Sequence, residues 1–243
     1  MGNLQVLQWA HSQGYQWDVS TCKEAASGGH LELLKWAKLN GCPWDDSTCL
    51  AAAEHGHLDV LEYTHSNGCP WNEQTLTVAA KHGHTKILIW AKSKDCTMDA
   101  SLCTSAAEGG QLATLIWCHE NGYRLDETIC IVAAASGQLK VIQWARGKGY
   151  PWNSQTCASA AGGGHLETLK WCHEHGCPWN EDTCSGAAYG GYLEVLEWAR
   201  ANDCPWDSTT LTLAEFNGHV KVTEWAEENG CPASESLLNL LTL

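Results

Sequence analysis

The chain has 243 residues and a lopsided composition, with 14 Trp and 14 Cys against one Phe and two Met. Its net charge of −14 argues against nucleic acid or anionic lipid as a partner, because phosphates need a basic face. The chain is long enough to bury a sizeable core, and its hydrophobic content of 44% indicates a folded protein rather than wholesale disorder.

The amino-terminal sequence and the cysteines both point to a reducing compartment. No basic flank followed by an apolar stretch marks a signal peptide after Met1, and no apolar run approaches the roughly 20 residues that a membrane-spanning helix needs. The cysteines do not form the irregular framework of a small disulfide scaffold. We therefore expect an intracellular protein, cytoplasmic or nuclear, with reduced cysteines and no membrane insertion.

An internal repeat of 27 residues runs through the whole sequence, and nine such repeats make 243 residues. Glycine recurs at this step without any insertion, at Gly2, Gly29, Gly56, Gly83, Gly110, Gly137, Gly164, Gly191 and Gly218. All 14 Trp lie in two columns, one with Trp9, Trp36, Trp90, Trp117, Trp144, Trp171, Trp198 and Trp225, the other with Trp17, Trp44, Trp71, Trp152, Trp179 and Trp206. The sequence predicts a single array over residues 1–243.

Within each repeat, the first predicted element is a short helix, which we call helix A. It follows a column of good N-cap residues, whose side-chain oxygens can accept hydrogen bonds from the amides of the first turn: Asp18, Asp45, Asn72, Asp99, Asp126, Asn153, Asn180, Asp207 and Ser234. A pair of alanines near its end, Ala25 and Ala26 in one copy, allows neighbouring helices to approach closely.

A second helix, helix B, is predicted to start after a turn at Gly29 and its equivalents, with apolar residues at helical spacing. It should end at a glycine in the left-handed conformation, at Gly14, Gly41, Gly68, Gly122, Gly149, Gly176 and Gly230. Asp95 and Asp203 hold this position in the two other repeats, and Asp is among the few residues that tolerate the conformation. Each repeat is therefore expected to contain two short helices and no strand.

One such helix pair cannot bury both of its faces alone, so neighbouring pairs must stack. The sequence predicts an all-α fold, an open α-solenoid of about nine stacked helix-turn-helix repeats with a continuous core. We expect the Trp and Cys columns to form ladders of core positions along this stack.

The repeat resembles the ankyrin repeat. Residues 29–42, GHLELLKWAKLNGC, are similar to the ankyrin second helix GHLEVVKLLLxxGA, and residues 21–26, TCKEAA, are similar to the ankyrin first helix TPLHxAA without its Pro. The unit is shorter than the ~33 residues of ankyrin repeats, and the missing residues fall before Ser47, where the β-hairpin finger belongs. The resemblance therefore implies ankyrin-like helix pairs with reduced or absent fingers.

The resemblance also implies a protein-binding function. Ankyrin proteins usually hold their partners with the fingertips and with the inner helix of each pair, so helix A would carry more of this role here. The expected function is a non-catalytic protein–protein interaction scaffold.

Cysteine and histidine show little sign of site chemistry. Leu replaces Cys in the column of Cys22, and Tyr replaces it in the column of Cys42, which a set of metal ligands would not tolerate. Cys172, His173, His175 and Cys177 lie close in sequence, but successive helical residues point about 100° apart and cannot converge on one zinc ion. We interpret the cysteines as small core residues.

Other catalytic patterns are missing from the sequence. The histidine of the Gly-His step (His30, His57, His84, His165, His219) alternates with Asn, Gln and Tyr, which favours a structural role in closing the turn between the two helices. No phosphate-binding loop or nucleophile motif occurs. We expect no enzyme activity and no cofactor, and a metal-binding protein or enzyme ranks third among the hypotheses.

Candidate partner-binding residues are those that the repeat does not conserve. One set follows the helix-A cysteine and consists of Lys23, Leu50, Thr77, Thr104, Ile131, Ser185 and Thr212. A second set is aromatic and lies in neighbouring repeats: Tyr189, Tyr192 and Phe216. Exposed aromatic residues are typical interface anchors, although such columns also vary on surfaces that bind nothing.

The last repeats are strongly acidic. From Glu181 onward there are 11 acidic residues against Arg200 and Lys221, which accounts for −9 of the net −14. We expect this acidic, aromatic-bearing surface to bind a basic segment of a protein partner. Neither end shows the polar capping repeat usual in solenoids, so the alternative function is a structural or linker subunit whose ends dock on other chains.

Overall fold

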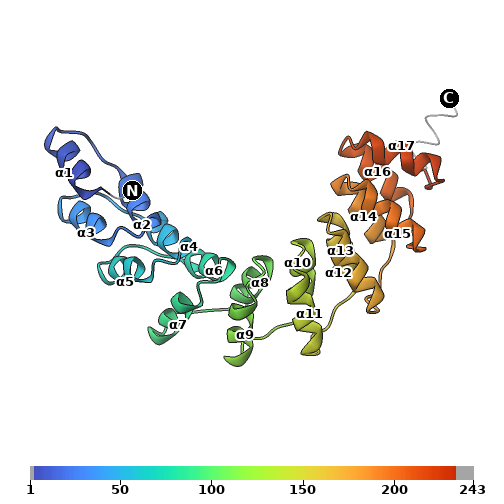
Figure 1. Cartoon of the computed structure of the whole chain (residues 1–243), viewed down its shortest axis with the longest axis horizontal. Helices are drawn as coiled ribbons and strands as arrows, with labels where there is room; N and C mark the ends of the chain where they lie inside the picture. Colours follow the sequence, from blue (N-terminus) through green and yellow to red (C-terminus); the bar gives the residue numbers. More distant parts are fainter. Residues whose placement is uncertain (1–2, 234–243) are drawn as a thin grey trace. The chain divides into compact units, whose positions relative to one another are not determined.

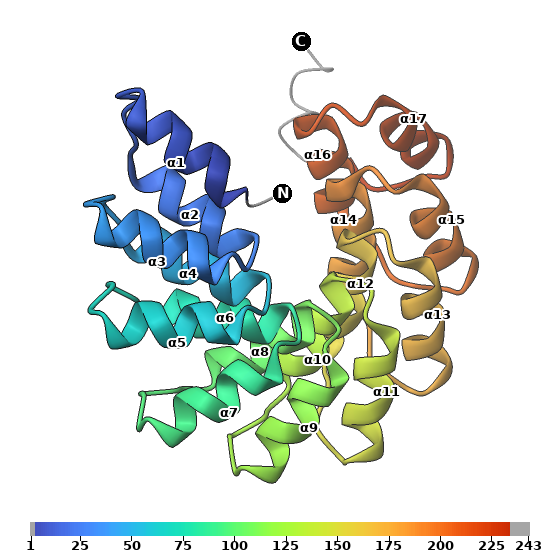
Figure 2. The same cartoon turned by 60° about the vertical axis from the view of Figure 1, so that its left-hand side comes forward.

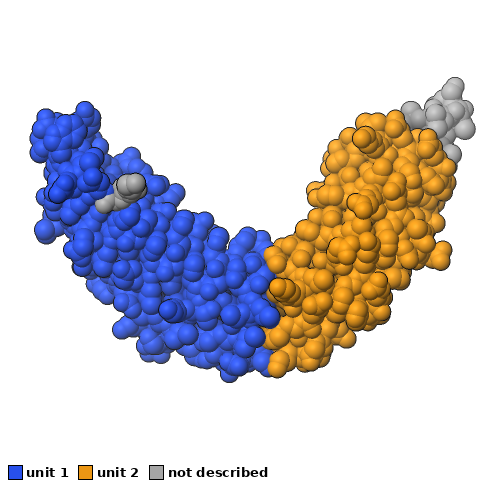
Figure 3. All heavy atoms as spheres, in the orientation of Figure 1, with its two compact units in different colours: residues 1–123 blue, residues 124–243 orange. Residues whose placement is uncertain are grey.

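The structure is a computed structural model that describes residues 3–233 (Figure 1). Within these residues the chain forms 17 α-helices and no strand, so the predicted all-α fold, an α-solenoid of helix-turn-helix repeats, is confirmed. The helices belong to two compact units, residues 1–123 (unit 1) and residues 124–243 (unit 2), which Figure 3 colours separately.

The A and B helices alternate along the chain. In unit 1 the A helices are α2 (Val19–Ser27), α4 (Asp46–Glu54), α6 (Glu73–Lys81) and α8 (Ser101–Glu108), and the B helices are α1 (Leu4–Ser12), α3 (Leu31–Leu39), α5 (Leu58–Ser66), α7 (Thr85–Ser93) and α9 (Leu112–Glu120). In unit 2 the A helices are α10 (Thr128–Ala135), α12 (Ser154–Gly162), α14 (Glu181–Gly190) and α16 (Ser208–Phe216), and the B helices are α11 (Leu139–Gly147), α13 (Leu166–Glu174), α15 (Leu193–Ala201) and α17 (Val220–Glu228).

The A helices of each unit form a tightly packed layer. Each packs against the A helix of the next repeat in its unit and against the B helix of its own repeat. Figure 2 shows the two rows in unit 1, with α2, α4 and α6 beside α3, α5 and α7. Small side chains permit this close approach, since Cys22, Ala25 and Ala26 of α2 are all buried. The B helices carry the bulky Trp residues and pack less closely with one another.

A core of aliphatic side chains lies between the two layers. Leu34 and Ala37 of α3 are fully buried, and Leu61 of α5 occupies the position of Leu34 in the next repeat and is also fully buried. Burying a Leu side chain contributes about 1.5–3 kcal/mol, so this column stabilises every repeat to a similar extent.

The N-cap column forms as predicted in most repeats. Asp45 accepts a hydrogen bond from the backbone amide of Ser47 at 3.0 Å. The equivalent bond is made by Asp18, Asn72, Asp99, Asp126, Asn153 and Asp207. Asn180 makes no such bond, because its side-chain amide donates to the Asp182 carboxylate instead. In α8 and α10 the helix begins one residue later than predicted, after Ala100 and Glu127. Ser234 lies outside the described residues.

The predicted ends of the B helices are also confirmed. Gly41 has a φ of +85°, and the two non-glycine residues at this position, Asp95 and Asp203, have φ values of +55° and +63°. A left-handed residue turns the chain sharply and leads it back to the next N-cap. Residues 3–233 contain no β-hairpin, so short loops replace the ankyrin fingers.

The prediction that the Trp columns form buried core ladders is wrong. No Trp of the described residues is fully buried, and Trp9 is 59% exposed. Most of the loop Trp residues instead meet the aromatic residue of the following B helix edge-on, as in Trp17–Trp36, with ring centroids 5.7 Å apart. An indole is too large to fit between layers that small side chains hold together, so the Trp residues line the edge of the core.

Candidate partner-binding surface

The variable column after the helix-A cysteine is not a uniform surface. Lys23 and Thr212 are exposed, whereas Ser185 is only 7% exposed. The remaining members are half-buried: Leu50, Thr77, Thr104 and Ile131. The cause is the close approach of neighbouring A helices, since a Cβ added to Gly186 would lie 2.8 Å from the Ala158 carbonyl oxygen. Few side chains of this column can reach a partner.

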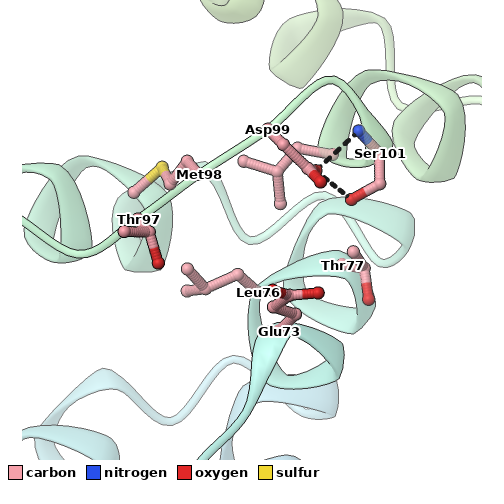
Figure 4. A pocket seen from close by; sticks show the side chains of 8 residues that line it. Glu73, Leu76, Thr77, Thr97, Met98, Asp99 and Ser101 are labelled. Carbon is pink, nitrogen blue, oxygen red and sulfur yellow. Dashed lines mark hydrogen bonds between the residues drawn. The ribbon is translucent and has the colours of Figure 1, made fainter.

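Thr77 borders a small hollow between the start of α6 and the loop before α8. Figure 4 shows the side chains of Leu76 and Met98 lining it, with Asp99 accepting hydrogen bonds from Ser101. Met98 occupies the position of a loop Trp in this repeat. The hollow measures about 100 Å³, which is below the usual size of a ligand pocket.

The column after the alanine pair differs between the two units. In unit 1, Lys81 Nζ lies 2.6 Å from Glu108 Oε1, so an ion pair connects α6 with α8. In unit 2 the same column holds Tyr189 and Phe216, which are 58% and 84% exposed. Exposed rings at equivalent positions of consecutive helices are typical of a binding surface.

Tyr192 has a different environment from the other two aromatic candidates. It is 40% exposed, and its ring lies over Gly164 and Gly190, where an added Cβ would come within 2.5 and 2.3 Å of ring atoms. Histidines of the same column reach back to a carbonyl oxygen 30 residues earlier, at 2.8–3.1 Å, from His57, His84, His165 and His219. These four histidines connect consecutive repeats, whereas Gln111 in the same column donates to the Gly109 carbonyl oxygen within its own turn at 3.0 Å, so the structural role of the column extends beyond the predicted closing of the turn.

The A helices of unit 2 contain no basic residue. The sequences of α10, α12, α14 and α16 include no Lys, Arg or His. Their charged residues are three exposed carboxylates, Glu181, Asp182 and Glu215. The A helices of unit 1 are mixed in charge, because they include Lys23 and Lys81. The A layer of unit 2 is therefore neutral to acidic throughout.

Both exposed rings lie at helix C-termini. Tyr189 is the penultimate residue of α14, and Phe216 is the last residue of α16. Neither helix has a basic residue in its own last turn, and the imidazole that reaches the end of α14 is that of His219, whose Nε2 lies 2.9 Å from the Tyr189 carbonyl oxygen. A cation beside either ring would interact favourably with both the ring and the helix end.

In the B layer, cationic and imidazole side chains cover the Trp rings of the loops. His173 stacks on Trp179 at 3.8 Å, and the Arg200 guanidinium lies 4.4 Å from the Trp206 ring centre. In unit 1 the Lys38 ammonium lies 4.1 Å from Trp44. Lys38, His173 and Arg200 hold the same position in their repeats, and each covers the indole of a loop Trp.

The four residues of the suspected zinc window point in different directions. Cys172 and Cys177 are buried, whereas His173 stacks on Trp179 and His175 stacks on Trp171. No group of three or more potential metal ligands occurs among residues 3–233. The window is structural in every contact that it makes.

The cysteines are all free, and all but Cys96 are buried. Burial raises the pKa of Cys22 to about 12 and that of Cys130 to about 11, which keeps both thiols protonated and poorly nucleophilic at neutral pH. The second cysteine column has a role that we did not predict: Cys69 Sγ donates to the carbonyl oxygen of the N-cap residue Asp45 at 3.2 Å. The cysteines of this column follow the N-cap residues of the preceding repeat by a constant 24 residues, and this spacing was the sequence signal for the contact.

The geometry defines an all-α repeat protein with tightly stacked inner helices. Residues 49–91 match the family model of ankyrin repeats (many copies), and no curated protein matches the chain. This match and the stacked helix pairs fit an ankyrin-like repeat protein whose repeats, within residues 3–233, contain no hairpin finger. Ankyrin repeats generally mediate protein–protein interactions and are typically non-enzymatic. None of the helices within residues 3–233 is long and apolar enough to cross a membrane.

Proposed function

We propose that this protein is a non-catalytic scaffold that binds other proteins through the A layer of unit 2. The observation that carries the proposal is the pair of exposed rings, Tyr189 and Phe216, on a layer whose other exposed side chains are small, polar or acidic. The acidic surplus of the last repeats favours a basic segment of the partner.

We also propose that the nine repeats act as one array in a reducing compartment, cytoplasmic or nuclear. The 27-residue period continues from unit 1 into unit 2 without insertion or deletion, as the glycines at 110 and 137 show. The 14 free thiols are the state that a reducing environment maintains.

One observation favours the second candidate, a structural or linker subunit. A hollow of about 560 Å³ lies between α1 and α2 and is lined by Val6, Leu7, Ala10 and Ala25, among others. Val6 is 57% exposed, whereas Val60 in the same column of the repeat is fully buried. A helix from another chain that docked here would bury this apolar surface.

Affinity capture with matched variants separates the two candidates. We expect the double variant Tyr189→Ser, Phe216→Ser to lose the partners that the wild-type chain captures from its native source. The control Leu39→Ser removes an equally exposed residue (86%) from a B helix and should retain them. Retention by the double variant combined with loss in Val6→Asp would refute the scaffold proposal and support the linker subunit.

A further inference from the structure

The spacing of the two exposed rings constrains the shape of a bound segment. Tyr189 and Phe216 are 27 residues apart and occupy the same column on α14 and α16, which pack directly against each other. Packed helices lie about 8–10 Å apart, so the two rings offer contact points at roughly this distance along the layer.

This distance fits one extended conformation well. In a polyproline II helix, residues i and i+3 point to the same side and lie about 9 Å apart, because there are three residues per turn with a rise of ~3.1 Å. In a β-strand, residues three apart point to opposite faces. A segment in the polyproline II conformation can therefore place two side chains, three residues apart, over the two rings.

The charge of the site selects the side chains that contact the rings. The carboxylate of Glu215 is exposed in the residue before Phe216, and neither α14 nor α16 has a basic residue in its last turn. The helices α10, α12, α14 and α16 contain no Lys, Arg or His, so none of their own side chains would repel a cation. Lys and Arg side chains also bind aromatic faces.

The residues of the same column in the two preceding repeats are small. Ala135 of α10 is exposed with only a methyl side chain, and Gly162 of α12 has no side chain. These residues raise no long side chain beside Tyr189, so a chain lying across α12, α14 and α16 meets the rings as the most prominent features of the layer.

We propose that the A layer of unit 2 binds a polyproline II segment of a partner protein, with Lys or Arg at every third residue seated on Tyr189 and Phe216. This inference rests on the proposed scaffold function and specifies the chemistry of its partner.

Two fluorescein-labelled peptides of identical composition test the spacing. One contains three copies of Arg-Pro-Pro, and the other contains the three Arg residues together followed by six Pro. Fluorescence anisotropy with the full chain should show about three- to fivefold tighter binding of the spaced peptide, because only that peptide can place a cation on both rings.

Variants then locate the preference. The Tyr189→Ser, Phe216→Ser double variant should bind the two peptides equally, and Leu39→Ser should keep the wild-type preference. Circular dichroism will verify that all variants are folded. Equal affinity of the wild-type chain for both peptides would overturn the proposal, as would a preference that survives in the double variant.

The peptide assay and the capture experiment can fail separately. If the double variant loses its native partners but the wild-type chain shows no preference between peptides, the scaffold function stands and the polyproline II inference falls. If native partners are retained by the double variant, the proposed surface itself is wrong.

Discussion

Units 1 and 2 use the same scaffold and differ at the position that follows the alanine pair of helix A. In unit 1 this position connects neighbouring repeats through the Lys81–Glu108 ion pair. In unit 2 the same position leaves Tyr189 and Phe216 largely exposed to water. The column therefore forms an ion pair between repeats in unit 1 and presents two exposed rings in unit 2.

This difference shows where specificity resides in a repeat protein. An exposed ion pair contributes about 0–1 kcal/mol to stability, and an exposed ring contributes less, so neither is needed for folding. Residues that the scaffold does not require are free to be shaped by a partner. The aromatic pair stands out because the small residues of the A layer surround it.

The largest expected effect on stability comes from removing an equivalent Trp in each unit, which tests whether the aromatic pairs stabilise both units equally. Trp90 of unit 1 meets Trp71 edge-on at 6.0 Å, and Trp198 of unit 2 meets Trp179 at 5.9 Å. Trp90→Ala and Trp198→Ala should each lower the free energy of unfolding by about 2–3 kcal/mol, less than for a fully buried Trp. Urea denaturation measures this, with the mostly exposed Trp9→Ala as control. A much larger loss in one unit would break the equivalence.

A second effect of similar size concerns the spacing of the A helices in unit 1. A Cβ added to Gly109 would lie 1.8 Å from the Lys81 carbonyl oxygen, whereas nothing lies within 4 Å of one added to Gly147. Gly109→Ala should cost about 2–3 kcal/mol by overpacking. Gly147→Ala should be neutral or stabilising by up to about 1 kcal/mol. Equal unfolding midpoints for the two variants would contradict the close packing at Gly109.

The buried threonines of helix A give a third comparison. The hydroxyl of Thr75 in unit 1 is buried without a hydrogen-bond partner, whereas the Thr156 hydroxyl in unit 2 accepts from the backbone amide of Asn153. Thr75→Val should stabilise the protein by about 1 kcal/mol and Thr156→Val should destabilise it by a similar amount. Thermal denaturation can measure both changes. The idea fails if the two variants shift stability in the same direction.

The smallest expected effect on stability comes from placing the aromatic residues of unit 2 at the same column of unit 1. In the double variant Lys81→Tyr, Glu108→Phe, unit 1 receives the aromatic pair of unit 2, at a cost of about 1 kcal/mol or less. This variant should bind the spaced Arg-Pro-Pro peptide about twofold more tightly than the wild type, because it offers a second pair of rings. Fluorescence anisotropy measures the gain. Unchanged binding would mean that two rings at this spacing are not sufficient.

The sequence predicted the helix boundaries well because they depend on local chemistry. A left-handed residue ends each B helix, and the two exceptions, Asp95 and Asp203, behave as their side chains allow. Asn180 departs from its column because Asp182, two residues later, attracts its amide. Even this deviation has a local cause.

The candidate surface was less accessible to prediction. Lys23 and Ser185 share one column, but Lys23 is exposed and Ser185 is buried, because neighbouring A helices approach each other to different degrees. Tyr189 and Tyr192 are three residues apart, but Tyr192 packs on the glycines of its own and the preceding repeat. A repeat pattern cannot separate Lys23 from Ser185, since it assigns the same environment to every member of a column.

The sequence by itself determined the helix pairs, their caps, the 27-residue period and the burial of small residues on helix A, since each follows from backbone preference and side-chain size. Only the tertiary structure decided that the Trp residues remain at the edge of the core and that Lys38 and its equivalents cover the loop indoles. It also decided that the rings of Tyr189 and Phe216 are exposed on the A layer of unit 2. These outcomes depend on the distance between neighbouring helices, which a repeat unit acquires only when it stacks on the next.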